Sequence, residues 1–138
     1  MRLFLDANVI YSASRSISGA SYVIFQLREK LSYSLVTSKL ALVESEKNLF
    51  EKERSEVIDH FYELIKNIDV ISVDSETAKK KYKDIIEEKD APILYGALKS
   101  KADYLLTLDK KHFFTKRLIQ SKFSFKIMTP GEFIRILR

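Results

Sequence analysis

Short apolar runs alternate with longer amphipathic stretches along the whole chain. Five of the runs have the length and composition of strands, at residues 3–5, 34–37, 70–73, 104–108 and 125–128. Between them, apolar residues recur at helical spacing, most clearly over residues 57–65, 93–98 and 113–118. Strands separated by helices predict parallel β/α/β crossovers and a sheet covered by helices on both faces. The nearly continuous apolar character of the strand runs is typical of strands buried on both faces.

The scarcity of turn-forming residues predicts a single α/β domain over residues 1–138. The chain has three Gly and two Pro, and it contains no internal repeat, low-complexity segment or linker. Gly19, Gly96 and Gly131 are too scattered to build a loop that cradles phosphate, which excludes a P-loop and a dinucleotide-binding fingerprint.

Two residue types that often carry chemistry are missing or scarce. The chain has no Cys, which excludes disulfides, thiolate metal sites and thiol catalysis. With only His60 and His112, a zinc site of several histidines is excluded as well, so we expect any metal to be held by oxygen. Residues 1–6 contain too little apolar sequence for a signal peptide, and no stretch reaches about 18 apolar residues, so we expect a cytoplasmic protein without membrane contact.

Basic charge is concentrated in the second half of the chain. The net charge is +5, and residues 1–78 carry 9 basic and 12 acidic side chains whereas residues 79–138 carry 15 and 7. An excess of this kind is typical of proteins that bind a polyanion such as nucleic acid. A solvated lysine-rich surface is the alternative, and it is favoured for residues 79–83 taken alone.

Carboxylates follow several of the predicted strands. Asp6, Asp74 and Asp109 come after the first, third and fourth strands, and Asp90 opens a helical pattern. Ligands of an open parallel sheet bind beyond the carboxyl ends of the strands, so three or four of these acids are placed to meet at one rim. Asp is also a preferred helix N-cap, which is the alternative for each of them. Asp90 is the strongest candidate for a cap, because Pro92 lies in the first turn of its helix.

Glu44 is different because it lies inside a predicted helix, residues 38–50, and cannot be the N-cap of that helix. Leu40, Val43 and Phe50 form one apolar face of the helix, and Glu44 lies at the edge of that face. A functional carboxylate and an ordinary residue at the border of the face both remain open for Glu44.

Five segments of the chain resemble motifs of the PIN domain family. They are residues 5–11 (LDANVIY), Thr37 and Ser38 together with Glu44, residues 90–94 (DAPIL), residues 102–113 (ADYLLTLDKKHF) and residues 128–133 (MTPGEF). Each motif is short, but the four acids Asp6, Glu44, Asp90 and Asp109 occur in the order and at the spacing of the family. The resemblance extends over nearly the whole chain.

The resemblance implies an α/β fold, a three-layer α/β/α sandwich with a five-stranded parallel sheet in the order 3-2-1-4-5, and metal-dependent cleavage of RNA. The first and fourth strands are then neighbours, which places Asp6 beside Asp109. Glu44 and Asp90 reach the same place from helices. Asp74 follows an outer strand in this order, and we expect it to be a cap or a surface residue.

Two further polar residues are placed by the same resemblance. Asn8 and Thr107 match polar positions next to the acids of the family. We expect both side chains to support the metal-binding acids by hydrogen bonding.

A cluster of carboxylates predicts a bound cation. Carboxylates within a few ångströms repel one another, which raises their pKa values unless a divalent cation neutralises them. Oxygen ligands suit Mg²⁺ or Mn²⁺, which also bind substrate phosphate. We expect Asp6 and Asp109 to contact the metal, directly or through water, and Asp90 to be a second ligand. Glu44 is expected either to bind metal or to orient the water that attacks phosphorus.

The expected reaction is an in-line displacement at phosphorus. One ion activates a water as the nucleophile, and a second ion, where it binds, stabilises the leaving 3′ oxygen. The resemblance implies products with 5′-phosphate and 3′-hydroxyl ends.

Basic side chains near the rim are expected to contact RNA phosphates. The nearest by sequence are Lys110, Lys111 and Lys116. A solvated helix face is the alternative for these lysines. His112 is expected to pack or to cap a helix, with no role in proton transfer.

Many small PIN domains are VapC-like toxins of type II toxin–antitoxin systems, inhibited by a cognate antitoxin and commonly dimeric. We expect that role here, with RNA as substrate and with an antitoxin and a second copy of the chain as partners. Other stand-alone members act in RNA processing. The alternative is a non-catalytic PIN-like module that binds RNA or a protein partner, and the presence of all four acids argues against it. An aspartate-based phosphatase is disfavoured, because Asn8 stands where it needs a second Asp. A phospho-receiver is disfavoured as well, because it needs a pair of acids beside the first strand and only Asp6 is present there.

Overall fold

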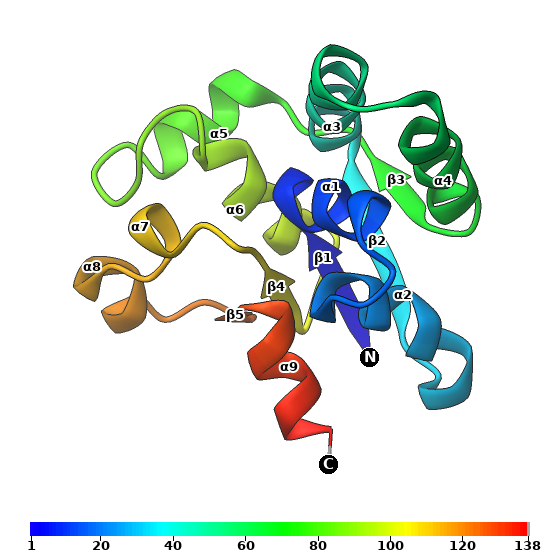
Figure 1. The fold of residues 1–138 in the computed structure, drawn as a ribbon. Helices are drawn as coiled ribbons and strands as arrows, with labels where there is room; N and C mark the ends of the chain where they lie inside the picture. The colour runs from blue at the N-terminus through cyan, green and yellow to red at the C-terminus, as the bar shows by residue number, and fades with distance from the viewer. Residues whose placement is uncertain (138) are drawn as a thin grey trace.

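One five-stranded sheet lies at the centre of the computed structural model, which describes residues 1–137 (Figure 1). Its strands are β1 (Arg2–Leu5), β2 (Ser34–Ser38), β3 (Asp69–Ile71), β4 (Tyr104–Leu106) and β5 (Lys126–Met128). All pairings are parallel, and the order is β3-β2-β1-β4-β5. The expected order is therefore confirmed, and β1 and β4 are central neighbours.

Helices cover both faces of the sheet. They are α1 (Ala7–Arg15), α2 (Ala20–Leu31), α3 (Lys39–Lys52), α4 (Ser55–Ile65), α5 (Ser75–Lys81), α6 (Ala91–Lys99), α7 (Lys110–Phe113), α8 (Lys116–Gln120) and α9 (Pro130–Ile136). Successive side chains of β1 point to opposite faces. Leu3 and Leu5 share a core with α1, α2, α4 and α9, whereas Phe4 belongs to the core formed with α5, α6, α7 and α8. The three-layer α/β/α sandwich is thus confirmed.

Strand β4 is shorter than the apolar run that predicts it. The run suggests a strand over residues 104–108, but β4 ends at Leu106. Beyond this point, the N–H of Leu108 donates to Oδ1 of Asn8 (3.0 Å) and the N–H of Asp109 donates to Oγ1 of Thr107 (3.1 Å). These N–H groups are committed to side chains, so the chain leaves the sheet at the position where the acids gather.

The edge strands β3 and β5 are only partly buried. None of their residues is fully buried, and Val70 of β3 is 42% exposed. The interpretation of every strand run as buried on both faces is therefore wrong for these two strands. It holds for the interior of β1, β2 and β4, which have neighbours on both sides.

Helix α3 buries a different face from the one that its large apolar residues suggest. Three of them are 44%, 63% and 61% exposed, namely Leu40, Val43 and Phe50. The buried face is formed by Ala41, Ser45 and Leu49. The Ser45 hydroxyl donates to the carbonyl of Ala7 in α1 (3.1 Å). Small side chains thus bring α3 close to α1, and the apolar face of α3 is left on the surface.

The apolar spacing over residues 113–118 predicts one helix, but the structure has two short ones, α7 and α8. The Thr115 side chain accepts a hydrogen bond from the N–H of Leu118 (3.3 Å) and so caps the start of α8. Phe113 and Leu118 are nevertheless buried in the same core. Within residues 1–137, no helix is long and apolar enough to cross a membrane.

Gly96 in α6 lies directly against the aromatic ring of Phe4. A Cβ atom at position 96 would lie 2.5 Å from Cζ of Phe4, which is fully buried. We expect Gly96→Ala to lower the free energy of unfolding by about 1–3 kcal/mol, because the buried ring of Phe4 would have to shift to admit the methyl group. Urea denaturation measures this change. Gly131→Ala is the matched control, because its Cβ would meet nothing closer than 4.0 Å, and an equal loss in both variants would contradict the prediction.

Candidate active site

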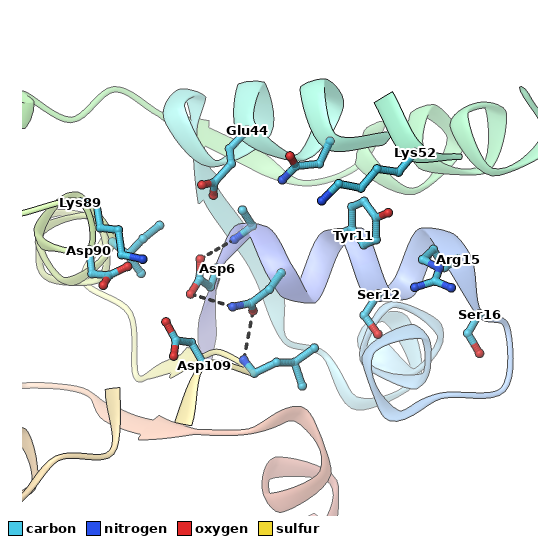
Figure 2. A pocket seen from close by; sticks show the side chains of 15 residues that line it. Asp6, Tyr11, Ser12, Arg15, Ser16, Glu44, Lys52, Lys89, Asp90 and Asp109 are labelled. Atoms are coloured by element: carbon cyan, nitrogen blue, oxygen red, sulfur yellow. Dashed lines mark hydrogen bonds between the residues drawn. The ribbon is translucent and has the colours of Figure 1, made fainter. Parts of the chain in front are cut away.

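The carboxyl ends of β1 and β4 border a cavity of about 800 Å³. Four carboxylates from separate segments line it, namely Asp6, Glu44, Asp90 and Asp109. Figure 2 shows them around a common space, with Glu44 reaching in from α3, Asp90 from the start of α6, and Asp6 and Asp109 from the ends of β1 and β4. The structure therefore brings together the four acids singled out in the sequence, at the point where strand order reverses.

Asp6 is the most buried of the four acids, with 6% of its surface exposed. It caps α1 by accepting the N–H of Ala7 (2.7 Å), and it also accepts the hydroxyl of Thr107 (2.7 Å). Burial raises the pKa of Asp6 to about 7, and the charges of Glu44 and Asp90 act in the same direction. The hydrogen bonds from Thr107 and Ala7 oppose this rise in pKa.

Asn8 and Thr107 join Asp6 to the loop that carries Asp109. The Asn8 amide donates to Oδ2 of Asp6 (3.3 Å), while its Oδ1 accepts the N–H of Leu108 (3.0 Å). The Thr107 hydroxyl donates to Asp6 and accepts the N–H of Asp109 (3.1 Å). Both side chains thus fix the relative positions of the two strand ends.

Asp109 is held from two sides by His112. Its Oδ1 accepts the backbone N–H of His112 (3.1 Å), which caps α7, and its Oδ2 lies 2.7 Å from Nδ1 of the ring. With its proton on Nδ1, the ring donates to this carboxylate oxygen. His112 is therefore part of the site, beyond the packing or capping role expected of it.

Asp90 occupies the N-cap position of α6 but does not cap the helix. Its backbone is already helical (φ −98°, ψ −14°), and its side chain forms no cap hydrogen bond, whereas a capping side chain needs an extended backbone to reach back to the first turn. The interpretation of Asp90 as the strongest cap is therefore wrong. Its Oδ2 is buried without a hydrogen-bond partner among residues 1–137. Burial raises the pKa of Asp90, and the neighbouring His112 opposes this rise.

Glu44 is exposed and reaches the cavity because of how α3 packs. The neighbouring Ser45 bonds to Ala7 at the start of α1, which holds Glu44 close to Asp6. Asp74, in contrast, follows the edge strand β3, accepts the hydroxyl of Thr77 and does not line the cavity. This position agrees with the expectation that Asp74 is a cap or a surface residue.

A second group of atoms that could serve as metal ligands shares Asp90 with the cavity. Within the described residues 1–137, one set of three offers ligand atoms within 4.8 Å of one another, namely Glu87, Asp90 and His112. The ring nitrogen of His112 in this set was not expected, because the sequence suggested oxygen ligands alone. Glu87 was missed in the sequence, because it lies in the irregular segment before α6, where spacing along the chain does not show which side chains meet.

The basic side chains that line the cavity differ from those nearest in sequence. Lys110, Lys111 and Lys116 are exposed on α7 and α8 and do not line it. The lining cations are instead Arg15, Lys52 and Lys89. The first two were missed because they come from α1 and α3. Their only signal in the sequence is a polar row at helical spacing, such as Glu44, Asn48 and Lys52.

The same fold occurs in solved structures of low sequence identity. VapBC2 from Rickettsia felis, bound to a DNA fragment from its promoter, is 16% identical with a TM-score of 0.70, and the match covers 94% of this chain and 98% of that one. PAE2754 from Pyrobaculum aerophilum is 13% identical with a TM-score of 0.63, covering 99% and 90%. VapBC-1 from nontypeable Haemophilus influenzae is 20% identical with a TM-score of 0.60, covering 95% and 99%.

Sequence comparison assigns the family directly. No curated protein sequence matches the chain significantly. The family model for the PIN domain, however, matches residues 2–111, from β1 to the beginning of α7. Because that match covers most of the chain and both central strands, the chain belongs to the PIN domain family.

Proposed function

We propose that this chain is a metal-dependent endoribonuclease that hydrolyses RNA phosphodiester bonds. The observation that carries the proposal is the convergence of Asp6, Glu44, Asp90 and Asp109 on one cavity at the ends of β1 and β4. The membership of the PIN domain family supports nuclease activity. Water's oxygen bonds to phosphorus, the bond from phosphorus to the 3′ oxygen breaks, and the products carry a 5′-phosphate and a 3′-hydroxyl.

The residues of the cavity fit a hard divalent cation, Mg²⁺ or Mn²⁺. All four acids offer carboxylate oxygens, the ligands that these ions prefer. The unpartnered buried Oδ2 of Asp90 is costly without a compensating donor or cation. We assign metal binding to Asp6, Asp90 and Asp109, with Glu44 as a further ligand or as the group that orients water. When bound, the ion would lower the pKa of a water and stabilise charge on the leaving oxygen.

The remaining polar residues keep the acids in place. Thr107 and Asn8 hold the Asp6 carboxylate, and Thr107 also fixes the backbone at Asp109. Glu44 is exposed and carries no hydrogen bond to other side chains within residues 1–137, which leaves its oxygens free to bind a metal or to orient a water. The lysines at 110, 111 and 116 follow Asp109 closely in the chain and remain predicted contacts for RNA phosphates.

A nuclease assay tests this proposal. The purified chain is incubated with a mixed pool of single-stranded and structured RNA in Mg²⁺, Mn²⁺ or EDTA. We expect cleavage with either ion and none in EDTA, with 5′-phosphate ends on the products. Folded protein that binds the RNA in Mn²⁺ without cutting it would favour the alternative of a non-catalytic module, and cleavage in EDTA would reject the metal.

For the biological role, we propose the toxin component of a type II toxin–antitoxin system. Solved structures with the same fold include VapBC2 from Rickettsia felis and a toxin–antitoxin complex from Klebsiella pneumoniae. The exposed apolar face of α3 (Leu40, Val43 and Phe50) supports a protein partner, because large exposed apolar patches mark interaction sites. The partners proposed are an antitoxin and a second copy of the chain, and sedimentation of the purified chain tests the homodimer.

His112 is expected to support metal binding through Asp109. Groups that hydrogen-bond to metal ligands typically contribute 10–100-fold to metal affinity or activity. We therefore expect His112→Ala to weaken Mn²⁺ binding by about tenfold, as measured by calorimetric titration. His112→Asn retains an N–H donor and should recover part of the loss. Equal affinity for wild type and His112→Ala would show that the ring does not hold Asp109 for the metal.

A further inference from the structure

The cavity continues beyond the carboxylates as a groove between α1 and α3. From α1 it is lined by Asn8, Tyr11, Ser12 and Arg15, from the C-cap of this helix by Ser16, and from α3 by Glu44, Asn48 and Lys52. Residues four apart share a helix face, so each helix contributes a continuous polar wall. At a rise of 1.5 Å per residue, the backbone of Lys52 lies about 12 Å farther along α3 than that of Glu44. The groove therefore leads away from the four acids by more than the length of one side chain.

The far end of the groove, formed by Arg15 and Lys52, is positively charged, and we name it the basic end. Figure 2 shows Lys52 extending toward the groove near Tyr11, with Arg15 beyond it. Lys52 is exposed and forms no ion pair within the described residues 1–137. Its charge is therefore available to a ligand.

Arg15 is anchored by one nitrogen only. Its Nε lies 3.5 Å from Oε2 of Glu53, and the same oxygen accepts the Tyr11 hydroxyl (2.7 Å). The guanidinium also lies over the Tyr11 ring, 5.9 Å from its centre, yet 58% of the Arg15 side chain remains exposed. Tyr11 and Glu53 thus orient Arg15 while its terminal nitrogens stay accessible.

Positive charge at this position suits an anion and not the divalent cation of the acid cluster. Arg and Lys are the usual partners of phosphate oxygens, and phosphates recur at every nucleotide of an RNA strand. The cavity volume of about 800 Å³ lies in the range of small-molecule sites. Such a volume is comparable to that of a few nucleotides of a single strand.

We propose that the basic end is a second subsite, which binds a phosphate of the same single RNA strand that is cut at the carboxylates. This inference rests on the proposed ribonuclease function. The bound phosphate lies at least one nucleotide from the cleaved bond, because the groove separates Lys52 from Glu44 by about 12 Å. Arg15 and Lys52 are positioning residues that draw the strand along α1 and α3.

The test compares substrates of two lengths in Mn²⁺. Steady-state kinetics are measured for wild type, Lys52→Ala and Arg15→Gln on a twelve-nucleotide single strand and on a dinucleotide. We expect kcat/KM on the longer strand to fall about tenfold in each variant, through a higher KM, whereas the dinucleotide is too short to reach the subsite and should show no difference. The salt dependence of RNA binding should become shallower by about one charge in each variant.

Lys47→Ala is the matched control, since Lys47 is an exposed lysine of the same helix that does not line the groove. Lys52→Arg should retain the wild-type KM. If Lys52→Ala loses no more activity than Lys47→Ala, the proposed subsite is wrong. The proposed function would still be supported in that case, because wild type cleaves RNA. Equal losses on both substrate lengths also overturn it, because they place Lys52 at the reaction centre. Wild type that cuts neither substrate rejects the proposed function and the subsite with it.

Discussion

Asp6→Asn is expected to lower RNA cleavage at least about a hundredfold while leaving the fold intact. Even residues that only support a metal ligand contribute 10–100-fold, and Asp6 is assigned to the metal itself. The amide has nearly the shape of the carboxylate, and its oxygen can still accept the N–H of Ala7, as Oδ1 does now, while its NH2 group takes the place of the Oδ2 that accepts the hydroxyl of Thr107. The substitution therefore removes the negative charge and exchanges one acceptor oxygen for an NH2 donor. Initial cleavage rates in Mn²⁺, together with circular dichroism of the variant, measure the two parts of this prediction.

Asp74→Asn is the control for this substitution. Asp74 also follows a strand and precedes a helix, but it lies outside the cavity. Its substitution should leave cleavage near the wild-type rate. Wild-type activity in Asp6→Asn, in a preparation free of other nucleases, would show that the four acids are not the reaction centre.

Without divalent metal, the protein is expected to become less stable as pH rises from about 5 to 8. Burial raises the pKa of Asp6 from its usual 3.8 to about 7, so the folded state holds a proton through a range in which the unfolded state has lost it. Stability falls with pH wherever the folded state binds more protons. The whole shift of about three pH units corresponds to about 4 kcal/mol in the free energy of unfolding, of which about 3 kcal/mol is lost between pH 5 and pH 8. The raised pKa of Asp90 acts in the same direction.

Urea denaturation in EDTA at pH 5 and pH 8 measures this dependence, with Asp6→Asn as the comparison. The variant carries no titrating group at position 6, so it should lose less stability over this range and be the more stable protein at pH 8. The lowered pKa values of Asp74 and Glu132 matter only at more acidic pH, where those groups take up protons. Identical pH profiles for the two proteins would show that burial of the charged Asp6 carboxylate does not lower the stability of the protein.

The part of the site that follows the strands could be predicted from the sequence. Asp6 and Asp109 come directly after apolar runs, and parallel topology then requires their strand ends to share one edge of the sheet. The order of the strands came from the family motifs, because apolar runs alone do not reveal which strands are neighbours. Asp90 was placed correctly at the start of a helix, but its role there depends on backbone angles that the sequence does not show.

The part of the site that depends on helix packing could not be predicted. Glu44 reaches the cavity because Ser45 contacts α1. The large apolar residues of α3, Leu40, Val43 and Phe50, lie on the surface and not in the core. Lys110, Lys111 and Lys116 were expected to be the cations of the site, because they follow Asp109 closely in the sequence. Lys52 and Arg15 line the cavity instead, since α1 and α3 pack side by side although they are distant along the chain.

The length of α1 has a consequence for how substrate registers on the protein. One rigid element carries Asp6 at its beginning and Arg15 at its end, so under the proposed function it fixes the distance between the cleaved bond and the phosphate bound at the basic end. Inserting one residue would lengthen α1 by about 1.5 Å and rotate its end by about 100°, turning Arg15 away from the groove. Only insertions near a whole turn would keep the two points on one face. If RNA binds as proposed, the distance between the two phosphates that the protein contacts can therefore change only in steps of about one helical turn.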